Sequence, residues 1–229
     1  MCKIVYEDNH LLVAVKPPNL LTQADATGDP DLLTLLKAYL KEKYQKPGAV
    51  YLGLVHRMDR PVGGLLALAR TSKAAARLSQ QVSRHEMGRE YLLVCQGEPP
   101  ARFTLTDYLL KDEGRNLVSC VPEDTPGAKR AVLHGHTLQS RQDLSLVRVR
   151  LETGRAHQIR AQLKAFGHPL WGDHRYGQGR PGRQIALWGA KLSLTHPTRK
   201  EPMTFYDLPQ GSVWDQFKEE LTHGETLFL

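Results

Sequence analysis

The spacing of apolar and polar residues along the chain predicts more strands than helices. A hairpin is expected over residues 3–15, where two apolar runs flank the turn signal Asp8-Asn9. Other short apolar or alternating runs lie between turn residues, which is typical of strands. These runs predict strands at 52–55, 65–70, 90–96, 129–139, 144–151, 185–194 and 203–206.

Helical spacing of apolar residues predicts a smaller number of helices. Asp29-Pro30 is expected to supply the N-cap and first-turn proline of a helix that runs to about Tyr44. Thr71 is expected to cap a second helix over 72–84. A short helix is expected around 157–166 and a closing helix at 213–221. The apolar face of the first helix should carry Leu32, Leu35, Leu36 and Tyr39.

Strands outnumber helices and do not alternate with them regularly, which favours an α+β fold. The expected architecture is a single catalytic domain over residues 1–229, built on a mixed, largely antiparallel sheet flanked by helices. An active-site cleft is expected across this sheet. The chain has 229 residues, enough for a sizeable core, and its Pro/Gly clusters are too short to be interdomain linkers.

Composition indicates an ordinary globular protein of a reducing compartment. Hydrophobic residues make up 41% and charged residues 24% of the chain. No apolar run is long enough to span a membrane, and the first residues lack the pattern of a signal peptide. The three cysteines are widely spaced, so no disulfide framework is expected. We therefore expect a cytoplasmic protein without a membrane partner.

The positive charge is concentrated in one part of the chain. The formal net charge is +7, but residues 141–200 hold nine Arg and three Lys against three acidic residues. The rest of the chain is therefore slightly acidic. In the strand expected at 144–151, Arg148 and Arg150 alternate with apolar residues, so both should project from one face. This pattern fits a polyanionic partner such as nucleic acid, or a basic face that only contacts solvent.

The segment 55–65 places a carboxylate among cations at a turn between two strands. It reads Val-His-Arg-Met-Asp-Arg-Pro-Val-Gly-Gly-Leu, so Arg57 and Arg60 flank Asp59. Adjacent cations favour the ionised form of a carboxyl group. An ionised carboxylate in a basic groove can act as a nucleophile or base. The alternative is a structural Asp–Arg pair that holds the turn.

The segment 153–163 combines a strand end with a basic helix start. Thr153-Gly154-Arg155 ends the strand, and Arg160 is expected on the polar face of the following helix. It could reach a carboxylate or a phosphate, or simply face solvent. Tyr91 begins an apolar strand, where a tyrosine is usually a core residue.

The sequence carries no sign of a cofactor or a metal. The histidines do not have the spacing of metal ligands, and no suitable Cys or carboxylate lies near them. There is no phosphate-binding glycine loop, dinucleotide fingerprint or nucleophile elbow. A cofactor-dependent enzyme is therefore disfavoured.

Together these segments resemble the RluA-type family of RNA pseudouridine synthases. The motifs occur in the order of the family and extend from about Ile4 to Pro209. The resemblance begins so early in the chain that no fused N-terminal RNA-binding domain is expected. The matching motifs are the opening hairpin with Lys16-Pro17, His56–Leu65, Arg89-Glu90-Tyr91, Thr153-Gly154-Arg155 with 157–160, Gly167-His168-Pro169, Gly172-Asp173, Tyr176-Gly177, Leu187 and His196-Pro197.

The resemblance implies isomerisation of specific uridines to pseudouridine in structured RNA, without a cofactor. It implies that Asp59 is the essential carboxylate, acting on the ribose or the base or as an acid–base group. Arg160 would pair with Asp59, and Tyr91 would lie against the target base. Arg57 would help to displace that base from its stack.

The resemblance also implies other substrate-binding residues, without a separate role for each. The basic block would contact the RNA backbone, and the apolar side of the pocket would include a leucine. The RNA is expected to be ribosomal or transfer RNA, with no obligatory protein partner. The implied substrate-binding residues are Arg57, Arg60, Arg155, His157, Gln158, Leu187, Arg148 and Arg150.

The chain departs from the family pattern at three places. The usual Thr-Ser-Gly after the aspartate is Val62-Gly63-Gly64, the usual Thr before His-Gln is Ala156, and the usual Leu-His-Ala is 187–189, Leu-Trp-Gly. None of these removes a residue that the reaction needs. Two other functions remain open: a non-catalytic RNA-binding or assembly factor on the same fold, and a glycosidase that releases free base.

Overall fold

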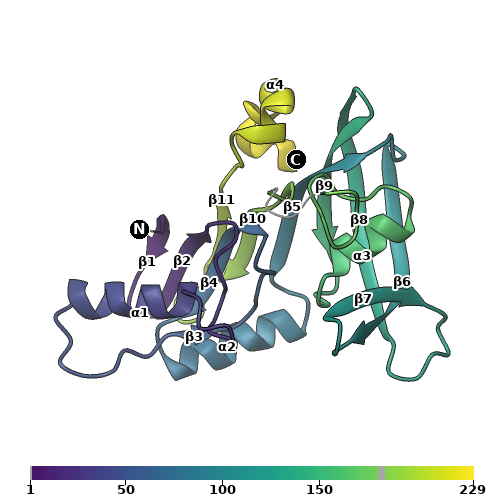
Figure 1. The fold of residues 1–229 in the computed structure, drawn as a ribbon. Helices are drawn as coiled ribbons and strands as arrows, with labels where there is room; N and C mark the ends of the chain where they lie inside the picture. The colour runs from purple at the N-terminus through teal and green to yellow at the C-terminus, as the bar shows by residue number, and fades with distance from the viewer. Residues whose placement is uncertain (1, 180–183) are drawn as a thin grey trace. The chain divides into compact units, whose positions relative to one another are not determined.

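The computed structural model describes residues 2–179 and 184–229 (Figure 1). Its internal contacts divide the chain into two compact units. Unit 1 comprises Met1–Gly88 and Gly189–Asp207, and unit 2 comprises Arg89–Trp188 and Leu208–Leu229.

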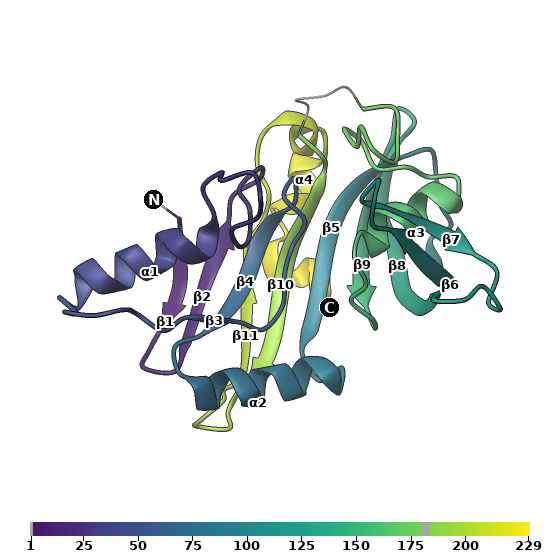
Figure 2. The ribbon, with the colours of Figure 1, turned by 60° about the horizontal axis from the view of Figure 1, so that its bottom comes forward.

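Unit 1 is built on strands in the order β1-β2-β4-β10, with β3 beside β4 and β11 beside β10. Every residue of β2 and β4 is buried, which explains their nearly continuous apolar sequences. In two views, α1 lies beside β1 and β2 (Figures 1 and 2). The elements are β1 (Ile4–Glu7), β2 (Leu11–Lys16), α1 (Leu32–Lys43), β3 (Gly53–Leu54), β4 (Gly63–Ala69), α2 (Ser72–Ser83), β10 (Leu187–Thr195) and β11 (Pro202–Tyr206).

Unit 2 is built on strands in the order β5-β9-β8-β6-β7. Helix α3 packs on β6 and β7 through a core that includes Leu109, Val118 and Ala161. The chain ends in short helical turns. The elements are β5 (Gly88–Gln96), β6 (Arg102–Asp112), β7 (Leu117–Val121), β8 (Lys129–Arg141), β9 (Leu144–Leu151), α3 (Gln158–Ala165), η1 (Ser212–Phe217), α4 (Lys218–Leu221) and η2 (Gly224–Phe228).

The predicted fold class is confirmed. Eight strand pairs are antiparallel: β1·β2, β2·β4, β3·β4, β10·β11, β5·β9, β8·β9, β6·β8 and β6·β7. The isolated bridge between Leu21 and Asp31 is parallel. The sequence prediction omitted β6 and β7, whose residues are largely exposed or half-buried and so lack a strong apolar pattern. The helix predicted at 213–221 differs in type, because its first part belongs to the 3-10 helix η1.

Helix α1 begins later than predicted, because the residues before it are held in an extended conformation. The N-cap is Asp31, whose side chain accepts a hydrogen bond from Thr34 N at 3.0 Å. Leu32 N donates to Leu21 O at 2.8 Å, so the chain stays extended up to Asp31. Leu35, expected on the apolar face, is 46% exposed, and the third buried leucine of α1 is Leu40.

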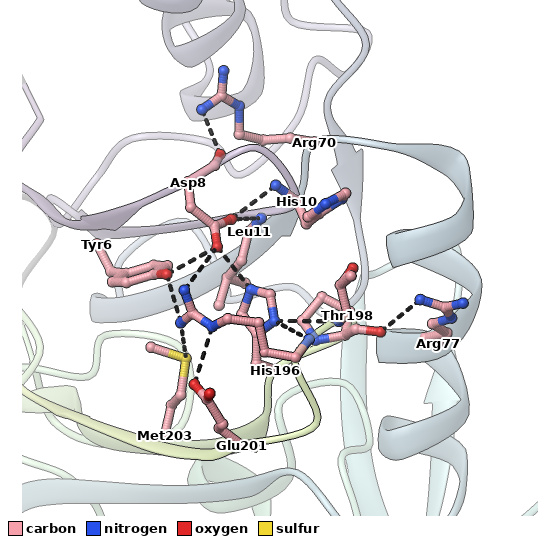
Figure 3. Close-up of polar contacts among 12 residues, drawn as sticks. Tyr6, Asp8, His10, Leu11, Arg70, Arg77, His196, Thr198, Glu201 and Met203 are labelled. Carbon is pink, nitrogen blue, oxygen red and sulfur yellow. Dashed lines mark hydrogen bonds and ion pairs between the residues drawn. The ribbon is translucent and has the colours of Figure 1, made fainter.

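Asp8 joins the β1–β2 turn to the turn that follows β10 within unit 1 (Figure 3). Its carboxylate accepts hydrogen bonds from the backbone N–H groups of His10 and Leu11, both at 2.8 Å. It also accepts from Tyr6 Oη at 2.9 Å and from Nε2 of the buried His196 at 2.8 Å. Partial burial opposes ionisation of Asp8, but these hydrogen bonds outweigh it and lower its pKa to about 2.

Because the pKa of Asp8 is lower in the folded state, its contribution to stability is present above about pH 4 and is lost as the pH falls towards 2. We expect this contribution to be about 1–2 kcal/mol, since solvent reaches part of the carboxylate. Asp8→Asn should lower the free energy of unfolding at pH 7 and reduce its decrease between pH 5 and 2. Urea denaturation across this pH range measures both quantities. The exposed Asp124→Asn is the control, and an Asp8→Asn curve parallel to that of the parent would contradict the assignment.

Candidate active site

Asp59 lies in the loop between β3 and β4 of unit 1 and is partly exposed. A turn follows it, closed by a hydrogen bond from Val62 N to Asp59 O at 3.0 Å. The residue before it is fixed by Thr22, whose Oγ1 donates to Met58 O at 2.8 Å and accepts from Met58 N at 3.3 Å. The backbone is therefore held on both sides of Asp59.

Lys16 braces the same loop from the interior. Its side chain is fully buried, and Nζ donates to three carbonyl oxygens: Pro17 at 3.1 Å, Leu20 at 2.8 Å and Arg60 at 3.0 Å. Burial lowers the pKa of Lys16 to about 7, while the negative charge of Asp59 acts in the opposite direction. The ammonium thus ties the chain after β2 to the loop that carries Asp59.

The two arginines beside Asp59 differ in their contacts. Arg60 forms an ion pair with Asp29 at 2.7 Å, and its Nε donates to Asn19 O at 3.2 Å. Arg57 is exposed and makes no side-chain hydrogen bond or ion pair within residues 2–179 and 184–229. Arg60 therefore stabilises the loop, and contacts of Arg57 and Arg60 with substrate stay predictions.

The glycine that ends this loop is required by a close backbone approach. Gly64 has φ +124°, and a Cβ there would lie 2.4 Å from the backbone N of Gly189. The departure from the family pattern at Val62-Gly63 leaves this glycine in place.

Arg160 of unit 2 forms a buried, bidentate ion pair with Asp173. Its Nε donates to Oδ2 at 2.7 Å and its Nη2 donates to Oδ1 at 2.9 Å. The prediction that Arg160 lies on a polar face was wrong: it is 3% exposed, because Asp173 provides an anion inside the protein. Asp173 also accepts from Arg175 N and Tyr176 N, at 3.0 and 3.1 Å. Burial opposes ionisation of Asp173, but Arg160 and these N–H groups hold its pKa below the usual value.

Tyr176 supports Arg160 from the side. The Arg160 Cζ atom lies 4.9 Å from the ring centroid of Tyr176, in a cation–π contact. The Tyr176 hydroxyl accepts a hydrogen bond from Val118 N at 2.8 Å and lies 2.7 Å from His157 Nδ1. His157 precedes α3 with a left-handed φ of 49°, which turns its ring towards Tyr176.

Gln158 is buried and organises the loop before α3. Its Oε1 accepts from Thr153 Oγ1 at 2.8 Å and from Arg155 N at 3.0 Å. Its Nε2 donates to Val132 O at 3.1 Å. The structure thus shows a bracing role for Gln158, and its contact with substrate stays a prediction.

Tyr91 and Leu187 are both nearly buried. Tyr91 lies on β5 opposite Val149 and is 7% exposed, while Leu187 begins β10 and is 3% exposed. Their roles beside a target base stay predictions.

The basic residues of unit 2 divide into exposed and covered ones. Arg150 and Arg155 are exposed. The prediction that Arg148 projects into solvent was wrong, because the C-terminal segment covers it: Nη1 donates to Leu227 O at 2.6 Å. Its Nε also lies 3.8 Å from the Glu90 carboxylate.

The predicted catalytic residues are distributed over the two units. Asp59 belongs to unit 1, and Tyr91 and Arg160 belong to unit 2. A pairing of Arg160 with Asp59, and a cleft that contains both, therefore stay predictions.

No specific role was predicted from the sequence for Lys16, Asp173 or Tyr176. Each was part of a motif of the resemblance, Lys16-Pro17, Gly172-Asp173 and Tyr176-Gly177. Their place in these motifs indicated that the three residues matter. Their roles could not be predicted, because the residues that they contact are distant in sequence.

Neither a metal site nor a membrane span is found where the structure can be described. No group of three or more His, Cys, Asp or Glu side chains in residues 2–179 and 184–229 could hold a metal ion. Over the same ranges, no helix is long and apolar enough to cross a membrane.

Comparison with known proteins gives a consistent result. A family model described as RNA pseudouridylate synthase matches residues 10–165. Ribosomal large subunit pseudouridine synthase D of Zymomonas mobilis is 32% identical over 221 residues, covering 91% of this chain and 69% of the relative. The protein of the same name from Escherichia coli K12 is 36% identical over 230 residues, covering 92% and 68%.

Solved structures share the fold. Human RNA pseudouridylate synthase domain containing 4 superposes with a TM-score of 0.76 at 20% identity, covering 96% of this chain and 92% of that one. Human RNA pseudouridylate synthase domain containing 1 gives a TM-score of 0.71 at 22% identity, covering 97% and 95%.

Removing the charge of Asp173 should take away the carboxylate that binds Nε and Nη2 of the buried Arg160. We expect Asp173→Asn to lower the free energy of unfolding by about 3–5 kcal/mol, as for other broken buried ion pairs. Urea denaturation at pH 7 measures this, with Asp124→Asn as the control, which should change stability by less than about 0.5 kcal/mol. A stability of Asp173→Asn equal to that of the control would show that Arg160 does not depend on this carboxylate.

The different contacts of Arg148 and Arg150 predict different effects of their removal. Arg150→Ala should weaken RNA binding and reduce the slope of log affinity against log salt by about 1, with little change in stability. Arg148→Ala should instead lower the melting temperature, because it loses its contact with the C-terminal segment. RNA titrations at several salt concentrations and thermal unfolding measure the two effects. Identical results for the two variants would refute this division.

Proposed function

The chain belongs to the RluA-type family of RNA pseudouridine synthases, and we propose that it isomerises specific uridines in large-subunit ribosomal RNA, with Asp59 as the essential carboxylate. The observation that carries the proposal is the loop of Asp59. A buried ammonium and a buried hydroxyl fix its backbone, while Asp59 remains partly exposed beside the exposed Arg57. Ribosomal RNA is favoured over transfer RNA as the substrate, because these relatives are named ribosomal large subunit pseudouridine synthase D.

The reaction needs neither an oxidant nor a cofactor. The bond between N1 of uracil and C1′ of ribose breaks, the base rotates, and a bond from C5 to C1′ forms. The proton on C5 is then removed and N1 gains a proton, so the product is an isomer of the substrate. Asp59 acts either as a nucleophile on the ribose or the base, or as an acid–base group.

Arg160 is proposed to orient Asp59. Asp173 binds Nε and Nη2 of Arg160, which fixes the plane of the guanidinium and leaves Nη1 outside that pair. A hydrogen bond from Nη1 would keep Asp59 ionised and aimed at the target nucleotide. Residues 1–229 would then act as one catalytic domain.

The target uridine has to leave its base stack before it can react. Unstacking costs a few kcal/mol, which interactions with the enzyme must offset. Arg57 is proposed to displace the base, Tyr91 to lie against its ring, and Leu187 to complete the apolar side of the pocket. Because ribosomal RNA is the proposed substrate, we place this activity in the cytoplasm.

The proposal is tested by Asp59→Asn, which preserves the shape of the side chain but removes its charge. We expect pseudouridine formation to fall by at least about 10³-fold, as for the loss of a group that acts directly in the reaction. RNA affinity should stay close to that of the parent, because phosphate contacts dominate it. Release of tritium from RNA containing [5-³H]uridine measures the rate, and filter binding measures the affinity.

Asp124→Asn, which removes an exposed carboxylate, serves as the control and should retain the activity of the parent. Turnover by Asp59→Asn within tenfold of the parent would remove Asp59 from its proposed role. The product distinguishes the other functions, because a glycosidase would release free uracil and a binding factor would leave the RNA unchanged.

A further inference from the structure

Arg89 occupies a defined position that the proposed mechanism does not use. It lies on β5 two residues before Tyr91, so both side chains emerge from the same face of the strand. Its guanidinium contacts the backbone of Gly154 in the loop before α3. A Cβ added to Gly154 would lie 2.4 Å from Nη1 and 3.0 Å from Nη2 of Arg89.

Among the residues that the structure describes, Arg89 is a cation without a hydrogen-bonding or ionic partner. Its Nε is buried and has no hydrogen-bond partner in the described chain, residues 2–179 and 184–229. In those ranges its guanidinium makes no hydrogen bond or ion pair. A covered cation without an anion is unfavourable, and an anionic ligand removes that cost.

A second cation lies next to the glycine that Arg89 contacts. Arg155 follows Gly154 directly and is exposed. Arg150 pairs with Glu90, so both lie on the other face of the sheet from Arg89. The carboxylate of Glu90 lies 3.8 Å from Arg148, and that of Glu152 lies 3.3 Å from the His134 ring. Neither of these two carboxylates forms an ion pair with Arg89 in residues 2–179 and 184–229.

We propose that Arg89 binds a phosphate of the RNA backbone beside the target nucleotide. The proposal rests on the proposed function, because it takes Tyr91 as the residue that contacts the target base. Two residues along a strand span about 7 Å, which suits a base and a phosphate close to it in the same RNA strand. The planar fork of an arginine can hold two phosphate oxygens at once.

Gly154 gives this site its shape. Its φ is not in the left-handed region, so alanine is compatible with the backbone at this position. The atoms that an alanine would meet are the flexible end of Arg89 rather than backbone. Gly154→Ala should therefore push the guanidinium out of its position while preserving the fold.

The experiment compares Arg89→Ala, Gly154→Ala and the double variant by titration with in vitro transcribed large-subunit ribosomal RNA at several KCl concentrations. Arg102→Ala is the matched control, since Arg102 is an exposed arginine of unit 2 whose side chain makes no hydrogen bond or ion pair in the described part. Arg89→Ala should weaken binding about tenfold and reduce the salt slope by about 1. Gly154→Ala should show a similar loss, and the double variant should lose little more.

Melting temperatures of all variants should stay close to that of the parent. Affinity and salt slope for Arg89→Ala equal to those for Arg102→Ala would overturn the proposal, as would fully additive losses in the double variant. A marked fall in melting temperature with unchanged affinity would show that Arg89 is structural. Because binding needs no turnover, a parent that binds RNA without forming pseudouridine would contradict the proposed function and leave the result on Arg89 valid.

Discussion

Burying a cation is costly unless oxygen atoms of the protein surround it, and this constraint fixes the segments that carry Asp59 and Arg160. The ammonium of Lys16 binds three carbonyl groups and thereby holds the loop of Asp59. The guanidinium of Arg160 binds both oxygens of Asp173. The substrate would then meet charged groups whose positions are set before it binds.

The same constraint separates structural arginines from those available to RNA. Arg148 contacts the C-terminal segment, so its charge is used within unit 2. Arg150 and Arg155 remain exposed, and Arg89 is partly covered without a partner in the described ranges. The basic block of the sequence is therefore divided between folding and binding, and only part of its charge can contribute to RNA affinity.

The sequence was sufficient for the fold class and for most strands, because β2, β4 and β9 have apolar patterns that few other structures would produce. It was insufficient where a distant contact decides the outcome. The extended pairing at Leu21 moved the start of α1, and the acceptor Asp173 drew Arg160 into the interior. Local patterns contain no information on such partners, so Lys16 and Tyr176 received no role.

The roles proposed for these residues depend on one activity, the conversion of uridine to pseudouridine in ribosomal RNA. The most direct measurement incubates the purified chain with unmodified large-subunit ribosomal RNA, digests the RNA to nucleosides and quantifies them by chromatography and mass spectrometry. We expect pseudouridine to appear, uridine to fall by the same amount, and no free uracil to form, as isomerisation requires. An unchanged nucleoside composition, or free uracil together with abasic ribose, would contradict it.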